Sequence, residues 1–396
     1  MDFKFTKEEE KFRQEVREFF KKELPKDWNG IGFNVEDEFH NPEVLSVRRM
    51  MARKMGEKGW LALSWPKAYG GLGRSHMEQL IFNEEISYHG VPGVDIFGIG
   101  MIGPTLIAHG TEAQKKEHLG YIARGERFWC QCFSEPNAGS DLASLQTKGV
   151  VEGDHIVING QKVWTTGAHF ADWCFALVRT DPDAPKHKGI TMVLADMKWP
   201  GIEVRPLYNM VGAHSFNEVF FDNLKVPLAN VVGGLNKGWE VANALLEFER
   251  SGIWRIAASQ RLIEEMVKYA NETAANGGVL AQDPLIRQKL AQLMVDVGVA
   301  RMLAYKVGWL QSNHQAPVYE ASMSKLFGSE LQLKTAEVGM QVLKLYSQLT
   351  EGDKRAPLWG RVEHWYMSHL GRVIAAGSSE IQRNIIAWRG LGLPRT

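Results

Sequence analysis

The feature that most constrains the fold of this chain is a change in its hydrophobic period, from helical to strand-like and back. Within residues 1 to about 125 apolar side chains recur at helical spacing, and Thr6 with Glu9 forms a capping box that starts the first helix. Pro25 ends this pattern. Further helices are expected at 47–60, closed by Gly59, at 76–90 and at 112–124. This part of the chain is therefore predicted to be a helical domain.

Residues 126 to about 235 change to short β-rich runs separated by glycine and proline. The run HIVI, followed by Asn159-Gly160 and then by QKVW, predicts a two-residue β-hairpin. Four more strands are expected at 173–180, 190–197, 202–207 and 216–226. Their spacing is typical of an antiparallel sheet, so a β domain follows the first helices.

Long helical patterns return from residue 236 to 396, at 239–275, 317–347 and 358–374. Asp283 is expected to cap a further helix, which Pro284 opens and which runs to about Trp309. The predicted fold class is α+β, with three domains at 1–125, 126–235 and 236–396. The last of them is expected to be a bundle of helices.

Composition excludes several classes of function. The 396 residues hold 46 Lys and Arg against 46 Asp and Glu, and a nucleic-acid-binding protein would need a basic excess. No apolar run approaches the roughly 20 residues of a membrane span, and the charged first residues do not resemble a signal peptide. Cys130, Cys132 and Cys174 are too few for a disulfide framework, so we expect core residues of a cytoplasmic protein.

The stretch Phe133 to Asp141, FSEPNAGSD, is the densest group of small and polar residues. A turn of this kind can bring backbone N–H groups and a hydroxyl to a phosphate, but taken alone it is typical of an ordinary loop. It lacks the spaced glycines of a Rossmann fold, and the chain has no P-loop, zinc or GxSxG pattern. No metal site is therefore predicted.

The order helices–β–helices, together with five sequence blocks, resembles the acyl-CoA dehydrogenases. The blocks are WLALSWPKAYGGLG (60–73), CQCFSEPNAGSDLASLQT (130–147), NGQKVWTTGAHFADW (159–173), FNEVFFDNLKVPLANVVG (216–233) and GSSEIQRNIIAWRGLGLPR (377–395). The resemblance implies the fold of that family, with a C-terminal four-helix bundle. It also implies FAD as cofactor and oxidation of an acyl-CoA thioester to the trans-2-enoyl-CoA. A carboxylate would remove the α-proton, and the β-hydride would pass to N5 of the flavin.

The same resemblance assigns eight positions to FAD binding. Phe133 and Ser134 match the loop along the flavin ring, and Gly139 and Ser140 match the pyrophosphate contact. The other four match residues beside the ring, or the C-terminal segment that reaches the dinucleotide: Trp164, Thr166, Ser378 and Glu380.

The catalytic base departs from the pattern of many family members, which place a glutamate where this chain has Ala376. The resemblance offers a second position, on the first helix after the β domain and directly before an arginine. Glu249 and Arg250 stand there, so Glu249 is the predicted base. Glu247, two residues earlier, points to nearly the opposite side of a helix. Asp95 is a third candidate.

Substrate and assembly are read from further departures. Ser140, Arg250 and Ala376 match substrate-binding positions, while an Arg-x-x-Phe-Gly stretch and a Gly-Gly-rich stretch of many members are missing. These losses resemble a subgroup that acts on bulky, alicyclic, dicarboxyl or steroid side-chain acyl-CoA. A homotetramer, or an α2β2 heterotetramer with a related chain, is expected, with an electron-transfer flavoprotein as acceptor. Two alternatives stay open: a non-catalytic subunit, and a desulfinase-like member with different chemistry.

Overall fold

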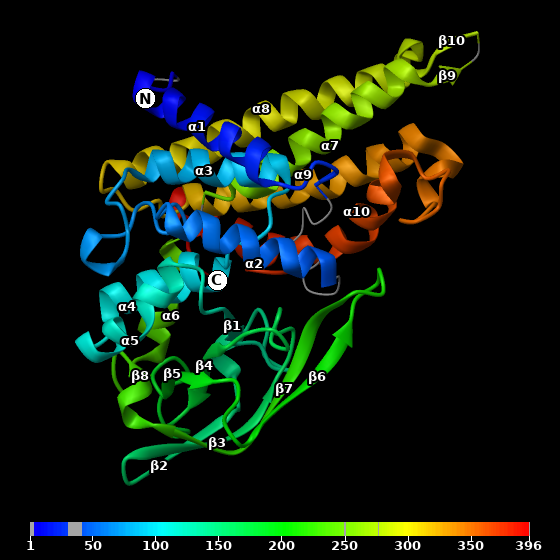
Figure 1. Ribbon diagram of the computed structural model, residues 1–396. Helices are drawn as coiled ribbons and strands as arrows, with labels where there is room; N and C mark the ends of the chain where they lie inside the picture. The colour runs from blue at the N-terminus through cyan, green and yellow to red at the C-terminus, as the bar shows by residue number, and fades with distance from the viewer. Residues whose placement is uncertain (1–3, 31–41, 249–250, 276, 396) are drawn as a thin grey trace. The chain divides into compact units, whose positions relative to one another are not determined.

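Figure 1 shows the chain as a computed structural model, which describes residues 4–30, 42–248, 251–275 and 277–395. Contacts between residues divide the chain into two compact units. One consists of Met1–Lys22, His76–Gly90 and Arg250–Thr396, and the other of Glu23–Ser75 and Val91–Glu249. The first is helical, and the second contains the β domain with additional helices. N-terminal and C-terminal segments thus share one unit, although the β domain separates them in sequence.

The first unit is built from helices on which the sequence predictions largely hold. The capping box is present, since the Glu9 N–H donates to Thr6 Oγ1 at 3.1 Å and the Thr6 N–H donates to Glu9 Oε2 at 2.7 Å. Asp283 caps the longest helix by accepting the Leu285 N–H at 2.9 Å. The helices are α1 (Lys7–Glu23), α3 (His76–His89), α7 (Ile253–Glu272), α8 (Pro284–Ser312), α9 (Glu320–Leu343), α10 (Arg361–His369) and α11 (Ser379–Ile385). Helix α8 packs against α7 and α9, and α3 packs against α7 and α8.

A buried ionic cluster joins α1 to α3 within this unit. Arg13 Nη1 lies 2.8 Å from Glu84 Oε2 and 2.6 Å from Glu85 Oε1, and Arg17 Nε lies 2.8 Å from Glu85 Oε2. Burial opposes the charge on Glu85, but hydrogen bonds from His89, Arg17 and Arg13 outweigh it and lower the pKa of Glu85 to about 2. The two helices are thus held by charges as well as by apolar packing.

One predicted helix is wrong in its continuity. The pattern at 239–275 forms two helices, α6 (Gly238–Phe248) in the second unit and α7 in the first. Gly252 precedes α7 with φ +65°, in the left-handed region that favours glycine and that a continuing helix cannot contain. The helical period is the same on both sides of this glycine, which is why the sequence pattern does not reveal the interruption.

The second unit is organised around an eight-stranded sheet in the order β6-β7-β3-β2-β4-β5-β8, with β1 beside β4 (Figure 1). Neighbouring strands are antiparallel except for β1 with β4 and β2 with β4. The strands are β1 (Trp129–Cys132), β2 (Lys148–Glu152), β3 (His155–Lys162), β4 (Trp173–Arg179), β5 (Ile190–Asp196), β6 (Ile202–Tyr208), β7 (His214–Pro227) and β8 (Val231–Val232). Helices α2 (Pro42–Glu57), α4 (Gly103–His109), α5 (Glu112–Ala123) and α6 complete this unit, and a short pair, β9 (Ala274–Ala275) with β10 (Gly278–Val279), belongs to the first.

The predicted hairpin at Asn159-Gly160 is wrong. Both residues lie inside β3, which pairs with β2 on one side and with β7 on the other, where the register shifts between Ile158 and Gly160. A Cβ at Gly160 would lie 2.8 Å from the Cα of Thr147, so glycine is needed for a close strand approach rather than for a turn. The hairpin in this region is formed by β2 and β3, and Gly153 in its turn has φ +62°.

The sheet carries its own apolar core, to which all three cysteines belong. Cys130, Cys132 and Cys174 are buried and reduced, as the sequence predicts, and Cys130 pairs in register with Cys174 across β1 and β4. Among the described residues, no helix is long and apolar enough to cross a membrane.

Candidate active site

The loop that follows β1 is fixed by a buried ion pair. Lys162 is completely buried at the end of β3, and its ammonium lies 2.8 Å from Glu135 Oε1 while donating to the carbonyl oxygen of Phe133 at 3.1 Å. Glu135 also accepts the backbone N–H groups of Gln146 and Thr147 at 2.6 and 2.9 Å. The buried carboxylate of Glu135 therefore connects the start of the loop to its end at residues 146–147.

Between these two ends, the loop carries exposed residues. Gly139 and Ser140 are exposed, and a Cβ at Gly139 would meet no atom within 4 Å. Within the part of the chain that the structure describes, neither the backbone N–H groups of these two residues nor the Ser134 hydroxyl form a hydrogen bond. The loop thus offers free donors on a rigid support, as binding of an anionic group requires.

In the loop after β3, residues 163–171, every second backbone N–H from Val163 to Gly167 donates a hydrogen bond to another segment. The Val163 N–H donates to the Ser134 carbonyl at 2.9 Å, and the Thr165 and Gly167 N–H groups donate to β7 at 3.0 and 3.1 Å. The two intervening residues, Trp164 and Thr166, are those predicted to face the flavin. Trp164 has φ +59° and is 59% exposed, and its ring packs edge-on against Phe216 with 5.8 Å between ring centroids.

These two loops fit an FAD molecule. A large exposed indole is unfavourable in water and would be covered by a flat ring system placed against it. Close by, the Ser134 carbonyl links the two loops, and the free donors of Gly139 and Ser140 suit a pyrophosphate. The site residues assigned to the second unit therefore lie on two connected loops of one sheet.

Ser378 and Glu380, the other predicted FAD contacts, belong to the first unit and serve α11 locally. Ser378 Oγ accepts the Ile381 N–H at 3.4 Å as the N-cap. A hydrogen bond from its own backbone N–H and one from Ser378 lower the pKa of Glu380. Both roles are compatible with an additional contact, and their assignment to FAD stays a prediction.

Ala376 lies in the turn just before α11, with its side chain exposed and with φ +54°, in the left-handed region. The Gln382 side-chain amide donates to the carbonyl oxygens of Ala376 and Gly377 at 3.2 and 3.3 Å. The position thus presents a methyl group on a bent backbone and has no group that can accept a proton.

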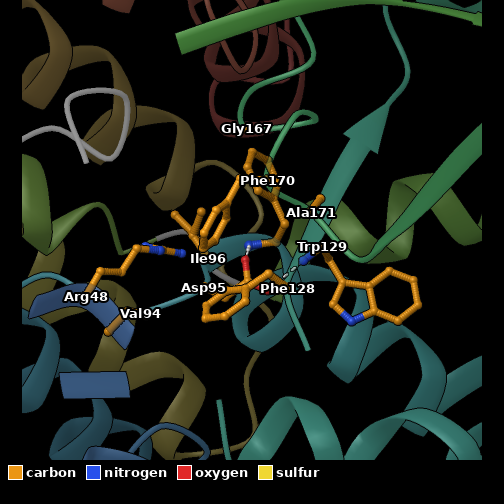
Figure 2. A pocket seen from close by; sticks show the side chains of 10 residues that line it. Arg48, Val94, Asp95, Ile96, Phe128, Trp129, Gly167, Phe170 and Ala171 are labelled. Atoms are coloured by element: carbon orange, nitrogen blue, oxygen red, sulfur yellow. Dashed lines mark hydrogen bonds between the residues drawn. The ribbon is translucent and has the colours of Figure 1, made fainter. Parts of the chain in front are cut away.

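Asp95, the third candidate base, lies in a small pocket of the second unit (Figure 2). Its Oδ2 accepts the Trp129 N–H at 3.0 Å and its Oδ1 accepts the Phe97 N–H at 3.2 Å, so both oxygens are bound to backbone. Burial raises the pKa of Asp95 to about 6, although Arg48 and the backbone donors oppose this shift. The pocket is lined by Arg48, Val94, Asp95, Ile96, Phe97, Phe128, Trp129, Gly167, Phe170 and Ala171.

This geometry assigns Asp95 a structural role. It ties the segment that starts the π-helical turn Gly98–Ile102 to the first residue of β1. A Cβ on Gly98 would lie 2.5 Å from Asp95 Oδ2, so the carboxylate is enclosed by its own backbone neighbours.

The two glutamates considered as the base lie at and just beyond the end of α6 in the sequence. Glu249 and Arg250 lie outside the described residues, and Glu247 is in the last turn of α6. The assignment of base and substrate contacts to these positions stays a prediction.

Three family models match this chain in order along its length. The N-terminal domain of acyl-CoA dehydrogenases matches residues 6–126, the middle domain matches 130–224 and the C-terminal domain matches 236–391. Helical, β and helical domains are thus those of a flavin-dependent oxidoreductase. The chain belongs to the acyl-CoA dehydrogenase family, an FAD-dependent family of enzymes that act on acyl-CoA. The predicted fold, cofactor and enzyme class are therefore confirmed.

Individual relatives cover the whole chain. The acyl-CoA dehydrogenase IpdE1 of Mycobacterium tuberculosis is 36% identical over 98% of both chains, and FadE26 of the same organism is 34% identical over 100% of this chain and 99% of its own. Among solved structures, the steroid ACAD Tcur3481-Tcur3483 superposes with a TM-score of 0.90 at 31% identity, covering both chains completely. The ChsE4-ChsE5 complex of M. tuberculosis has the same TM-score and coverage at 34% identity.

Sequence reasoning missed three residues that hold these loops: Glu135, Lys162, and Asn217 on β7, whose backbone carbonyl accepts the Thr165 N–H. Each is polar and buried, and each lies in a block that carries the family resemblance. A lysine and a glutamate 27 positions apart give no periodic signal, so the ion pair could not be found from spacing.

Proposed function

We propose that this enzyme oxidises the Cα–Cβ bond of an acyl-CoA thioester to the trans-2-enoyl-CoA, with Glu249 as the base that removes the α-proton. The main support is that neither of two other positions considered, Ala376 and Asp95, can act as a base. Ala376 carries only a methyl group, and both oxygens of Asp95 accept hydrogen bonds from backbone N–H groups. A base must be free to approach the α-carbon, which Asp95 is not.

The described residues supply binding and orientation. Trp164 and Thr166 are proposed to lie against the flavin ring, together with Phe133 and Ser134 at the other loop. Bound FAD supplies the acceptor for the hydride equivalent. The rigid support given by Lys162 and Glu135 keeps these contacts in place without reorganisation during the reaction.

The phosphates of the cofactor and of CoA are assigned to donors that the fold leaves free. Gly139 and Ser140 present N–H groups toward the pyrophosphate, with Ser140 also serving the CoA side, and Ser378 and Glu380 contact the dinucleotide. The chain carries no net charge, so these phosphates must be met by local donors rather than by an overall positive field. Arg250 is the proposed cationic partner near the substrate.

The proposed substrate carries a bulky acyl group, alicyclic or steroid-derived. The exposed methyl of Ala376 leaves room where a glutamate side chain would otherwise extend, and the similarity to a steroid ACAD supports the same direction. A preference for short straight chains would contradict this assignment.

The proposed assembly is a tetramer that contains a related chain. Helix α8 exposes an unusual apolar stripe, and the similarity to the two-chain ChsE4-ChsE5 complex supports a partner of the same family on this face. The stripe comprises Ala291, Met294, Val295, Gly298, Val299 and Met302. The proposed electron acceptor is an electron-transfer flavoprotein, for which family membership is the support.

Anaerobic titration of the purified, FAD-loaded protein with straight, branched, dicarboxyl and alicyclic acyl-CoA tests the proposal. Loss of the flavin absorbance with a bulky acyl-CoA, and a product two hydrogens lighter by mass, are expected. If flavin and activity appear only on co-expression with a related chain, and the activity of that complex survives E249Q, this chain is instead a non-catalytic subunit. Loss of a larger group from the substrate would indicate different chemistry.

A further inference from the structure

Asn217 on β7 is a polar residue with no exposed surface, and it is hydrogen-bonded to the 163–171 loop. Its backbone carbonyl accepts the Thr165 N–H at 3.0 Å. Its side-chain Nδ2 donates to the Thr165 carbonyl oxygen, also at 3.0 Å. A buried amide is costly unless its donors are paired, and here a single asparagine pairs with both backbone groups of one residue.

Two histidines complete the bonds of this amide. Asn217 Nδ2 lies 3.2 Å from Nδ1 of His169, and its Oδ1 lies 2.8 Å from Nε2 of His214. The Thr165 carbonyl oxygen can only accept, so the atom facing it must be the NH₂ group, and this fixes the orientation of the amide. His214 then donates from Nε2, and His169 accepts at Nδ1.

The rings of His169 and His214 also stack on each other, with their centroids 4.0 Å apart. His169 belongs to the 163–171 loop itself, whereas His214 begins β7. The amide of Asn217 therefore connects the middle of the loop, the far end of the loop and the strand in one set of hydrogen bonds. Thr165 lies between Trp164 and Thr166, the two residues predicted to face the flavin.

We propose that Asn217 is a positioning residue for FAD. It holds Thr165 from both sides, and thereby sets how Trp164 and Thr166 meet the flavin, without touching the cofactor. This inference rests on the proposed flavin contacts of those two residues. A rigid support of this kind matters because a displacement of about 1 Å at a reacting centre is enough to cost roughly a hundredfold in rate.

Replacing Asn217 by leucine tests the proposal, because the leucine side chain has a similar volume but cannot form hydrogen bonds. Asn159 gives a matched control, because it also bridges β3 and β7 by accepting the Asn223 N–H at 2.8 Å, but on the exposed side of the pair. We expect N217L to weaken FAD binding about tenfold and to change the shape of the bound flavin absorption band. N159A should leave both unchanged, and melting of the two apoproteins reports any general loss of stability.

A second pair of variants decides the matter if N217L does not fold. His214 is partly exposed, so its replacement is tolerated more easily. H214L removes the donor to Asn217 Oδ1 and should weaken FAD binding a few-fold, whereas H214Q keeps an amide donor and should restore most of it.

Wild-type FAD affinity and an unchanged flavin band in N217L would overturn the proposal, as would equal FAD affinities of H214L and H214Q. These readouts are binding and absorbance. They are therefore distinct from the failure of the proposed function, in which the wild-type protein binds FAD but no acyl-CoA bleaches it.

Discussion

Two parts of the proposed site are held in place by different kinds of contact. The loops at 133–147 and 163–171 in the second unit are fixed by buried polar groups that are distant in sequence, namely Lys162 with Glu135 and Asn217 with Thr165. In the turn at Ala376 and Gly377 in the first unit, the carbonyl oxygens are bound by a near neighbour in sequence, the side-chain amide of Gln382. The Ala376 side chain is exposed.

This difference indicates that the two parts of the proposed site have different roles. Long-range buried contacts keep the proposed flavin loops in one geometry whether or not a ligand is present. A turn fixed by local hydrogen bonds can accept changes of side chain without loss of the fold, which suits the acyl-group contact proposed for Ala376.

Replacing Lys162 by methionine should have the largest effect on stability. The change leaves Glu135 buried without its cation, which costs about 3–5 kcal/mol in the free energy of unfolding. Urea denaturation of the apoprotein measures it. The control is K186M, which breaks the exposed pair of Lys186 with Asp141 near the same loop and should change little. Equal effects of the two variants would show that the buried pair does not fix the loop.

Asp95 should make stability depend on pH in the direction opposite to most carboxylates. Its pKa is raised from 3.8 to about 6 by burial, so the folded state holds a proton that the unfolded state releases. Stability relative to D95N should therefore fall as pH rises from about 4 to 6, by on the order of 2 kcal/mol. Thermal melting across this range measures the difference. A gap between the two proteins that is constant with pH contradicts the assignment.

Gly160 and Gly139 separate strand packing from cofactor contact. G160A places a methyl group 2.8 Å from the Thr147 backbone and should cost about 1–3 kcal/mol of stability. G139A meets no atom of the chain, so the apoprotein should melt normally while FAD binding weakens. Calorimetry and flavin fluorescence distinguish the two. Normal FAD affinity in G139A would remove Gly139 from the pyrophosphate site.

Ser378 should give the smallest effect, because it caps a helix of only seven residues at an accessible turn. S378A is expected to lower stability by about 0.5–1 kcal/mol. If the side chain also contacts the dinucleotide, FAD affinity falls as well, and S378T should restore both. A loss as large as that of K162M would mean that the turn is not held locally.

Most of the fold could be predicted from the sequence because hydrophobic period and caps are local signals. The caps at Thr6 and Asp283, and the alternating patterns of the four strands predicted between residues 173 and 226, depend on a few neighbouring residues each. The errors at Gly160 and Gly252 have a different cause, since a glycine can serve a turn, a close strand approach or a helix break. Which of these uses applies depends on the segments that pack against the glycine in the fold, and these are distant in sequence.

The candidate site divides in the same way. Trp164 and Ser140 could be predicted as flavin and phosphate contacts because they lie in contiguous motifs that resemble the family, and these roles stay predictions. Glu135, Lys162 and Asn217 could not, because their roles depend on groups brought together from separate strands. Asp95 could be named as a candidate base, but only its hydrogen bonds to Trp129 and Phe97 show how its carboxylate is used.

Rapid-mixing measurement of flavin reduction tests whether Glu249 is the base of this acyl-CoA dehydrogenase. E249Q and the matched control E247Q are each loaded with FAD and mixed anaerobically with the best bulky acyl-CoA substrate. We predict that E249Q keeps bound FAD but loses at least about a thousandfold in reduction rate, while E247Q stays close to wild type. Reduction of E249Q at the wild-type rate, or loss of reduction in E247Q alone, would contradict the claim.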